Sequence, residues 1–448
     1  MMKKRPSPRF LQSALTGMLC LLLIFSAPAS HAEKMEIHGS NTIGARLAPM
    51  LVEGFLRSRG NDPIETLGNG KLNEKLLTGN RGDIRLQILV AAHGSSTGFQ
   101  ALEAKSADIW ASSRSVKPAE AQQLAGRANL RAPESEHVIA IDGLAVLVHP
   151  SNRVNQLSID TLAKIFSGEI SNWSEVGGAN QPINLYARDD RSGTWDTFKS
   201  LVLGKRYPLH VSSRRYESNN RLSDDVSADP GGIGFSGLAS VRKSKVLAIS
   251  DGDAPAQKPS RLNVASEDYP LSRRLFMYTL GDAATAMTKD FVEFVLGEEG
   301  QGIVAESGFV SQNPMAVKPD LADSTPPTFK LLTQNYKRLT VNFRFSEGRT
   351  KLDNKAQRDL RRVAGYLNRE SRNTDDLMLI GFADQQTNEL RAQMISELRA
   401  LSVRKALSDF DVHDVRYTGY GQYMPVGMAG GKHGKRRNGR VEVWVRDR

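Results

Sequence analysis

The sequence predicts a two-part protein, a long α/β region followed by a short α+β unit. Residues 33 to about 315 alternate short apolar runs with amphipathic runs, and glycine-rich turns separate them, which is the pattern of an α/β domain. Residues 339–448 follow the order β-α-β-α-β-β. Four prolines in residues 313–338 interrupt the periodicity between the two parts and predict a linker.

Residues 1–32 predict a cleaved signal peptide. A basic start at Lys3, Lys4 and Arg5 precedes a short apolar run over 15–25, and Ser30-His31-Ala32 forms a small-x-small cleavage site. The apolar run is too short to span a membrane, and no later segment reaches about 18 uninterrupted apolar residues. We therefore expect a mature chain over 33–448 that is periplasmic and has no transmembrane segment.

Composition excludes several classes of function. The chain has 448 residues, of which 40% are hydrophobic, so it can form real cores. Its only cysteine, Cys20, lies in the predicted leader, and no histidine pair has the spacing of metal ligands, so we expect no metal, no cofactor and no disulfide. The net charge is +11, with the densest basic cluster near 432–440. Because the signal peptide predicts secretion, nucleic acid is disfavoured as a partner of the basic residues, and polyanions of the cell envelope are favoured.

Regular elements in the first region justify its α/β assignment. Apolar runs over 84–92, 143–149 and 183–187 predict strands. The following amphipathic segments predict helices: 45–57, 158–166, 195–203 and 288–296.

Three helix starts in this region are rich in serine, threonine and glycine. They are 39–44, 94–98 and 188–194, and a fourth segment, 107–114, ends a short strand in hydroxyl side chains. Helix starts of this kind offer free N–H groups and the positive end of the helix dipole. Arg188 adds a forked cation. Together these features predict a buried oxyanion site.

Further motifs extend the pattern: 162–173, 232–235, 269–273 and 300–304. With them, residues 37–310 resemble the phosphate-binding protein of the bacterial phosphate ABC uptake system. The resemblance implies an α/β two-lobe periplasmic-binding-protein fold of type II that closes on phosphate, and an inner-membrane phosphate permease as a partner. The implied ligands of phosphate are Thr42, Ile43, Ser95, Ser113, Arg188, Ser192, Gly193 and Thr194.

Two positions depart from that family. Ile43 stands where a large aromatic residue is common, and Ser113 stands where the family has an aspartate. That aspartate accepts the proton of hydrogen phosphate and repels sulfate, whereas a serine can donate. We therefore expect weaker discrimination between phosphate and sulfate here. Asp190, near Arg188 in sequence, is expected to orient the guanidinium.

The second region has its own elements. Strands are predicted over 339–345, 377–382, 416–419 and 440–446, and the first helix carries one apolar face from Leu352 to Leu367. Leu390, Met394, Leu398 and Leu401 mark the second helix. Asp384 follows a strand and Arg399 lies on the next helix. An acid and a base that meet there can recognise a zwitterionic group.

This region resembles the OmpA-like peptidoglycan-binding domain. The matching segments are 345–346, 395–400, 419–425 and 434–442. The resemblance implies that Asp384 and Arg399 bind the diaminopimelate of the peptidoglycan stem peptide. Phe382 and Ala383 replace a polar pair, and Gly439-Arg440 replaces paired arginines. The alternative is a domain that has lost wall affinity and serves in dimerisation or docking. The basic residues at 432 and 435–437 are expected to form a solvated loop.

The sequence thus predicts a non-catalytic solute-binding protein that captures phosphate or a related oxyanion and is anchored to peptidoglycan, at the wall or outer membrane. One alternative is a structural envelope or adhesion protein that reuses the scaffold without a ligand. Another is a phosphatase, since 94–98 fits a G-x-S-x-G turn, with His137, His149 and His210 as later histidines. Tethering favours sensing, scavenging or storage over bulk uptake.

Overall fold

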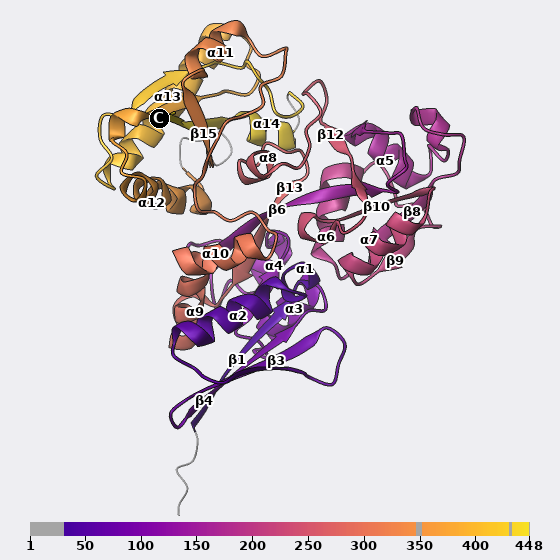
Figure 1. The fold of residues 1–448 in the computed structure, drawn as a ribbon, viewed down its shortest axis with the longest axis vertical. Helices are drawn as coiled ribbons and strands as arrows, with labels where there is room; N and C mark the ends of the chain where they lie inside the picture. Colours follow the sequence, from indigo (N-terminus) through magenta and orange to yellow (C-terminus); the bar gives the residue numbers. More distant parts are fainter. Residues whose placement is uncertain (1–30, 346–351, 430–431, 448) are drawn as a thin grey trace, which may run out of the picture.

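The computed structural model describes residues 31–345, 352–429 and 432–447. Most of the predicted signal peptide, Ser346 of the predicted C-terminal motif and the last residue lie outside these ranges. The described chain forms a first lobe, a second lobe and a C-terminal unit (Figure 1). In Figure 1 the first lobe lies at the bottom, the second lobe at the right and the C-terminal unit at the top left.

The first lobe is built from residues 31–135 and 279–312. Its strands are β1 His31–Gly39, β2 Ile64–Gly68, β3 Glu74–Arg81, β4 Ile84–Ala91 and β5 Ile109–Ser112. Its helices are α1 Asn41–Gly44, α2 Leu47–Ser58, α3 Ser95–Glu103, α4 Pro118–Gln123, α9 Ala286–Leu296 and α10 Glu298–Glu306, with a short turn at Gly281–Ala283. The predicted helix over 45–57 corresponds to α2, and the short helix α1 precedes it.

The second lobe is built from residues 149–271. Its strands are β7 Gln156–Ser158, β8 Asn184–Arg188, β9 Arg214–Tyr216, β10 Gly232–Gly237, β11 Lys245–Val246 and β12 Ala248–Ser250. Its helices are α5 Ile159–Ser167, α6 Gly193–Phe198, α7 Asn219–Ala228 and α8 Arg261–Ala265, with short helical turns at Trp173–Val176, Lys199–Leu203 and Leu238–Ser240.

Two long strands connect the lobes. They are β6, Glu136–Val148, and β13, Ser272–Tyr278, which pair antiparallel. The main sheet runs in the order β2-β3-β4-β1-β5-β13-β6-β10-β8-β9, so these two strands lie in its middle. β1 pairs parallel with β4 and β5, and β8 pairs parallel with β10 and β9. The carboxyl ends of β1, β5 and β8 are therefore followed by the serine- and threonine-rich turns.

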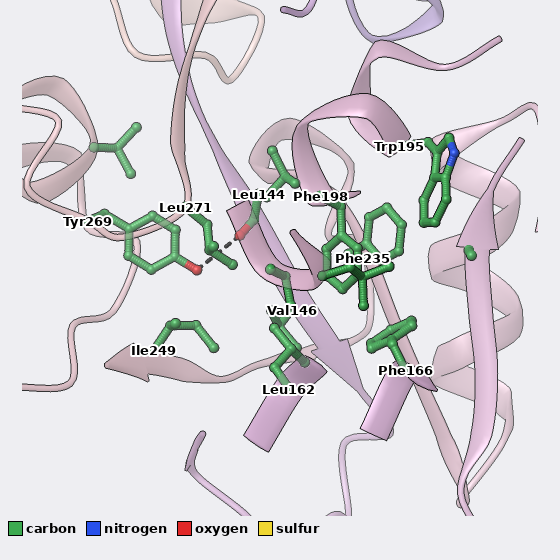
Figure 2. Close-up of a cluster of buried hydrophobic side chains, with 14 of the residues drawn as sticks. Leu144, Val146, Leu162, Phe166, Trp195, Phe198, Phe235, Ile249, Tyr269 and Leu271 are labelled. Atoms are coloured by element: carbon green, nitrogen blue, oxygen red, sulfur yellow. Dashed lines mark hydrogen bonds between the residues drawn. The ribbon is translucent and has the colours of Figure 1, made fainter. Parts of the chain in front are cut away.

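An aromatic cluster holds α6 in place. The rings of Phe198 and Phe235 stack with centroids 3.8 Å apart, and Phe166 packs edge-on against both (Figure 2). Trp195 lies over Phe235, and the Tyr269 hydroxyl donates to the Leu144 carbonyl at 2.9 Å on the far side of the cluster. Trp110, Trp173 and Trp195 are all buried and belong to the same hydrophobic core. The cluster fixes the start of α6 relative to the sheet.

The C-terminal unit takes in part of the predicted linker. Its strands are β14 Ala316–Val317, β15 Tyr336–Arg344, β16 Leu377–Gly381, β17 Arg416–Gly419 and β18 Arg440–Arg446, in the sheet order β14-β15-β18-β16-β17. Its helices are α11 Pro327–Thr333, α12 Asn354–Arg369, α13 Glu389–Ser408 and α14 Lys432–Asn438, with a turn at Thr374–Asp376. Segment 313–338 thus contains β14, α11 and the start of β15. Two of the four prolines, Pro326 and Pro327, cap and begin α11, where a proline costs no hydrogen bond.

The helix that the spacing of Leu390, Met394 and Leu398 predicts is present as α13, and these three side chains face away from the core. Leu390, Met394 and Leu398 are 83%, 56% and 48% exposed. The buried face carries small residues, including Ser396 and Ala400. This follows from the sheet, because a Cβ at Gly381 would lie 1.9 Å from the Ser396 carbonyl oxygen. The helix lies so close to β16 that only small side chains fit between them.

The C-terminal unit packs against both lobes. On α12, the Arg362 guanidinium donates to Gln312 of the first lobe at 2.9 Å. On β15, Arg338 and Arg344 donate to Asp268, at the end of the second lobe, at 2.6 and 2.8 Å. Arg338, Arg344 and Asp268 are all buried. The unit therefore lies across the two strands that connect the lobes.

Candidate functional site

Arg188 ends β8 and is 1% exposed. Its guanidinium donates to the carbonyls of Tyr216 and Glu217 and to Oδ1 of Asn219. Burial lowers the pKa of Arg188 to about 10, and the nearby Arg273 acts in the same direction. Three of its five N–H groups thus have acceptors among the described residues, and two are available to an anion.

Asn219 joins Arg188 to the first lobe. Its amide nitrogen donates to Thr42 Oγ1 at 3.2 Å, and Thr42 Oγ1 lies 3.1 Å from Thr194 Oγ1. Thr42 belongs to α1 of the first lobe, whereas Thr194 and Asn219 belong to α6 and α7 of the second. A continuous chain of hydrogen bonds therefore crosses the lobe interface.

Arg273 of β13 completes this chain from the connecting strands. Its guanidinium donates to Thr194 Oγ1 at 2.7 Å and reaches Thr42 Oγ1 at 3.5 Å. The same guanidinium pairs with Asp142 of β6 at 2.6 Å, and both side chains are buried. Burial raises the pKa of Asp142, while Arg273 opposes that shift. With Arg188 and Arg273 on one side and Asp142 on the other, the cluster carries an excess positive charge.

Ser95 and Ser113 lie beside this cluster. Their hydroxyl oxygens are 3.3 Å apart, and the Ser113 N–H donates to Ser95 Oγ at 3.1 Å. Gly193 of the second lobe packs directly against both, because a Cβ there would lie 2.3 Å from Ser95 Oγ and 2.6 Å from Ser113 Oγ. Only glycine allows the lobes to approach this closely.

One prediction is wrong, and two of the predicted ligands make further contacts within the fold. The Ile43 side chain lies in the core of the first lobe, and its N–H donates to the Ser40 carbonyl at 3.2 Å. The Ser192 hydroxyl caps α6 by accepting from the N–H groups of Thr194 and Trp195. Asp190 does not orient Arg188. Its carboxylate pairs with Arg215 at 2.7 Å and is 86% exposed.

The two lobes are closed against each other. Asp196 of the second lobe pairs with Arg114 and Lys117 of the first lobe, both at 2.8 Å. Asn73 donates to Glu217 at 2.8 Å, also across the interface. All eight predicted ligands are buried. The structure gathers seven of them into one region at the lobe interface: Thr42, Ser95, Ser113, Arg188, Ser192, Gly193 and Thr194.

A second cluster lies at the end of β16. Asp384 is buried and accepts from the Asn438 amide at 2.9 Å, while Arg399 donates to the Phe382 carbonyl at 2.9 Å. Burial lowers the pKa of Arg399, and the Asp384 carboxylate opposes that shift. The two charges are thus close in space, and among the described ion pairs none joins them directly.

Phe382 and the basic residues have structural roles that the sequence did not reveal. The Arg440 guanidinium lies 3.9 Å over the Phe382 ring, and both are buried. Arg437 pairs with Asp251 of the second lobe. The expected solvated basic loop is therefore wrong for Arg437, which contributes to the domain contact.

A cavity of about 1040 Å³ lies between the second lobe and the C-terminal unit. Arg261, Lys318, Phe329 and Trp444 line it, and none of the residues around Arg188 does. The chemistry suited to an anion therefore belongs to the closed lobe interface. Across the described residues, no group of three or more His, Cys, Asp or Glu is arranged to hold a metal ion. No helix in the described ranges is long and apolar enough to cross a membrane.

Asn219, Arg273 and Asp142 were missed as site residues by sequence reasoning. Arg273 ends segment 269–273, which entered the sequence analysis only as part of the family resemblance. Asp142 immediately precedes the predicted strand over 143–149. A buried arginine and a buried aspartate in register on neighbouring strands, as these are, have no local signal in the chain. Asn219 follows Ser218, the cap of α7, and looks like an ordinary helix start.

Comparison with known proteins gives two families. A model of the PBP superfamily domain matches residues 79–299, and a model of the OmpA family matches residues 344–439. Protein SphX of Synechococcus elongatus is 34% identical over 240 residues, which are 50% of this chain and 69% of SphX. Phosphate-binding protein PstS of Bacillus subtilis is 29% identical over 310 residues, 68% of this chain and 94% of that protein.

A solved structure is also similar. It is a phosphate ABC transporter substrate-binding protein of Clostridium perfringens with bound phosphate, with 26% sequence identity and a TM-score of 0.51. The match covers 62% of this chain and 99% of that one.

Proposed function

We propose that this chain, which belongs to the phosphate-binding proteins of the PBP superfamily and carries an OmpA-family domain, captures phosphate or a related tetrahedral oxyanion between its lobes. The observation that carries the proposal is the buried cluster of Arg188, Arg273, Thr42 and Thr194. Buried cations and hydroxyl donors without enough internal acid favour an anionic guest.

Calorimetry on the Arg188→Ala variant tests this proposal. A charge-assisted contact of this kind is worth about 1.5–3 kcal/mol, so phosphate affinity should fall by at least about tenfold. Arg242→Ala is the matched control, because Arg242 is an exposed arginine of the second lobe that pairs with Asp224. A wild-type chain that binds neither phosphate, sulfate nor any other oxyanion would favour the structural envelope protein instead.

The C-terminal unit is proposed to bind peptidoglycan through Asp384 and Arg399. The support is their proximity at the end of β16 and the OmpA-family match. A carboxylate beside a guanidinium suits the ammonium and carboxylate of a diaminopimelate side chain. On this view the protein is a periplasmic receptor held non-covalently at the wall, and an inner-membrane phosphate permease is its proposed partner.

A pull-down with purified peptidoglycan tests the wall contact. The Asp384→Ala and Arg399→Ala variants should lose most retention, since each removes one half of the zwitterion recognition. Arg404→Ala, on the same helix but paired with Asp414 at the surface, should be retained like the wild type. Equal retention of all four proteins would contradict the proposal and leave the unit as a docking module.

A further inference from the structure

Arg273 is the one residue of the cluster that reaches hydroxyl groups from both lobes. Its Nη1 donates to Thr194 Oγ1 at 2.7 Å, and its Nη2 lies 3.5 Å from Thr42 Oγ1. Asp142 holds the guanidinium from behind, through contacts of 2.9 and 2.6 Å to Nε and Nη2. The cation is therefore fixed on the connecting strands and directed at the lobe interface.

These contacts determine where the hydroxyl protons point. A hydroxyl has one proton and two acceptor sites. Thr42 Oγ1 accepts from Arg273 and from Asn219, so both of its acceptor sites are used and its proton must be donated. Thr194 Oγ1 accepts from Arg273. The contact of 3.1 Å between the two threonine hydroxyls can therefore only be a donation from Thr42 to Thr194. Thr194 Oγ1 then accepts from both Arg273 and Thr42, so its own proton is left to donate to a guest.

The serine pair on the other side behaves differently. Either Ser95 Oγ or Ser113 Oγ can be the donor in their contact at 3.3 Å. No arginine donates to either hydroxyl among the described hydrogen bonds. This side of the site can therefore either donate to an anion or accept a proton from it.

We propose that Arg273 is a positioning residue that makes Thr42 and Thr194 donors only. The threonine side of the site then takes unprotonated oxygen atoms of a tetrahedral oxyanion, and a protonated oxygen must face Ser95 and Ser113. This inference rests on the proposed oxyanion binding and adds to it the orientation and protonation state of the guest. It also assigns to Asp142 and Asn219 the role of holding the two donors.

Calorimetry with phosphate and with sulfate, each at acidic and alkaline pH, tests the inference. The main variant is R273Q/D142N, because replacing both partners leaves no unpaired buried charge. We expect phosphate affinity to fall by about tenfold or more, and the ratio of phosphate to sulfate affinity to change with it. When R273Q/D142N is introduced into a T42V/T194V protein, phosphate affinity should fall by less than about threefold, because the hydroxyls that Arg273 orients are already absent.

Several outcomes overturn the inference. Equal losses in the two backgrounds would show that Arg273 acts independently of the threonines. An unchanged phosphate-to-sulfate ratio would show a structural role only. If R273Q/D142N does not fold, the R273K variant tests the inference instead. The lysine side chain would keep the ion pair with Asp142, but an ammonium cannot span both hydroxyls as the guanidinium fork does. Phosphate binding by R273K equal to that of the wild type would also overturn the inference. A wild type that binds no oxyanion would instead refute the proposed function.

Discussion

Arg188 carries a charge that the protein only partly compensates. The carboxylates of Asp189 and Glu217 oppose the lowering of its pKa, while burial and Arg273 cause it. An anion at the lobe interface would offset the cost of burying both guanidinium groups. The residue-level question is then which anion the neighbouring hydroxyls accept.

Ser113→Asp should convert the site to one that discriminates against sulfate. The Ser113 hydroxyl lies against Ser95 and Gly193, so a carboxylate there would accept the proton of hydrogen phosphate and repel a fully ionised anion. We expect the phosphate-to-sulfate affinity ratio to rise by about tenfold or more, measured by calorimetry. Ser113→Ala is the control, because it removes the hydroxyl without adding charge. The same ratio in Ser113→Asp and Ser113→Ala would contradict this reasoning.

At the level of elements, the packing of α13 against β16 depends on close contact rather than on large apolar side chains. Gly381 and Gly419 face Ser396, and Ala392 and Ala400 are fully buried. Leucine spacing located the helix correctly along the chain, but it indicated the wrong face. Its period cannot distinguish a core-facing stripe from an exposed one when the sheet presents glycines.

Gly381→Ala should strongly destabilise the C-terminal unit. Its Cβ would lie 1.9 Å from the Ser396 carbonyl oxygen, and such overpacking costs about 1–3 kcal/mol or more. Gly365→Ala on α12 is the matched control, because a Cβ there meets nothing within 4 Å, and an alanine in a helix should stabilise by about 0.5–1 kcal/mol. Chemical denaturation of the full chain measures both. A Gly381→Ala chain as stable as the wild type would contradict the proposed packing.

At the level of the whole molecule, buried ion pairs join the C-terminal unit to the lobes. Asp268 of the second lobe meets Arg338 and Arg344 of β15. Burial alone would raise the pKa of Asp268, but the guanidinium groups of Arg338, Arg440 and Arg344 outweigh it and hold the pKa at about 2. Because the same unit also contacts the first lobe through Arg362, any rotation of the lobes must break one set of contacts.

Acid should detach the C-terminal unit. The native pKa of Asp268 lies below the ordinary value of 3.8, so its contribution to stability is present above about pH 4 and is lost as the pH falls toward about 2. We expect the radius of gyration, measured by small-angle scattering, to rise over this range. Asp268→Asn should show the extended form at neutral pH, because it leaves buried arginines without their acid. A compact Asp268→Asn chain at neutral pH would rule out Asp268 as the main contact.

The sequence alone determined the order of most elements, the positions of the hydroxyl-rich turns, and the placement of Asp384 after a strand and of Arg399 on the next helix, because these depend on local periodicity and short motifs. The tertiary structure decided what surrounds them. Arg273, Asp142 and Asn219 join the cluster only because strands and helices far apart in sequence meet at the lobe interface. Likewise, the exposed leucines of α13 and the ion pair of Arg437 with Asp251 depend on which surface lies beside each element, and neighbouring residues in the chain do not encode that.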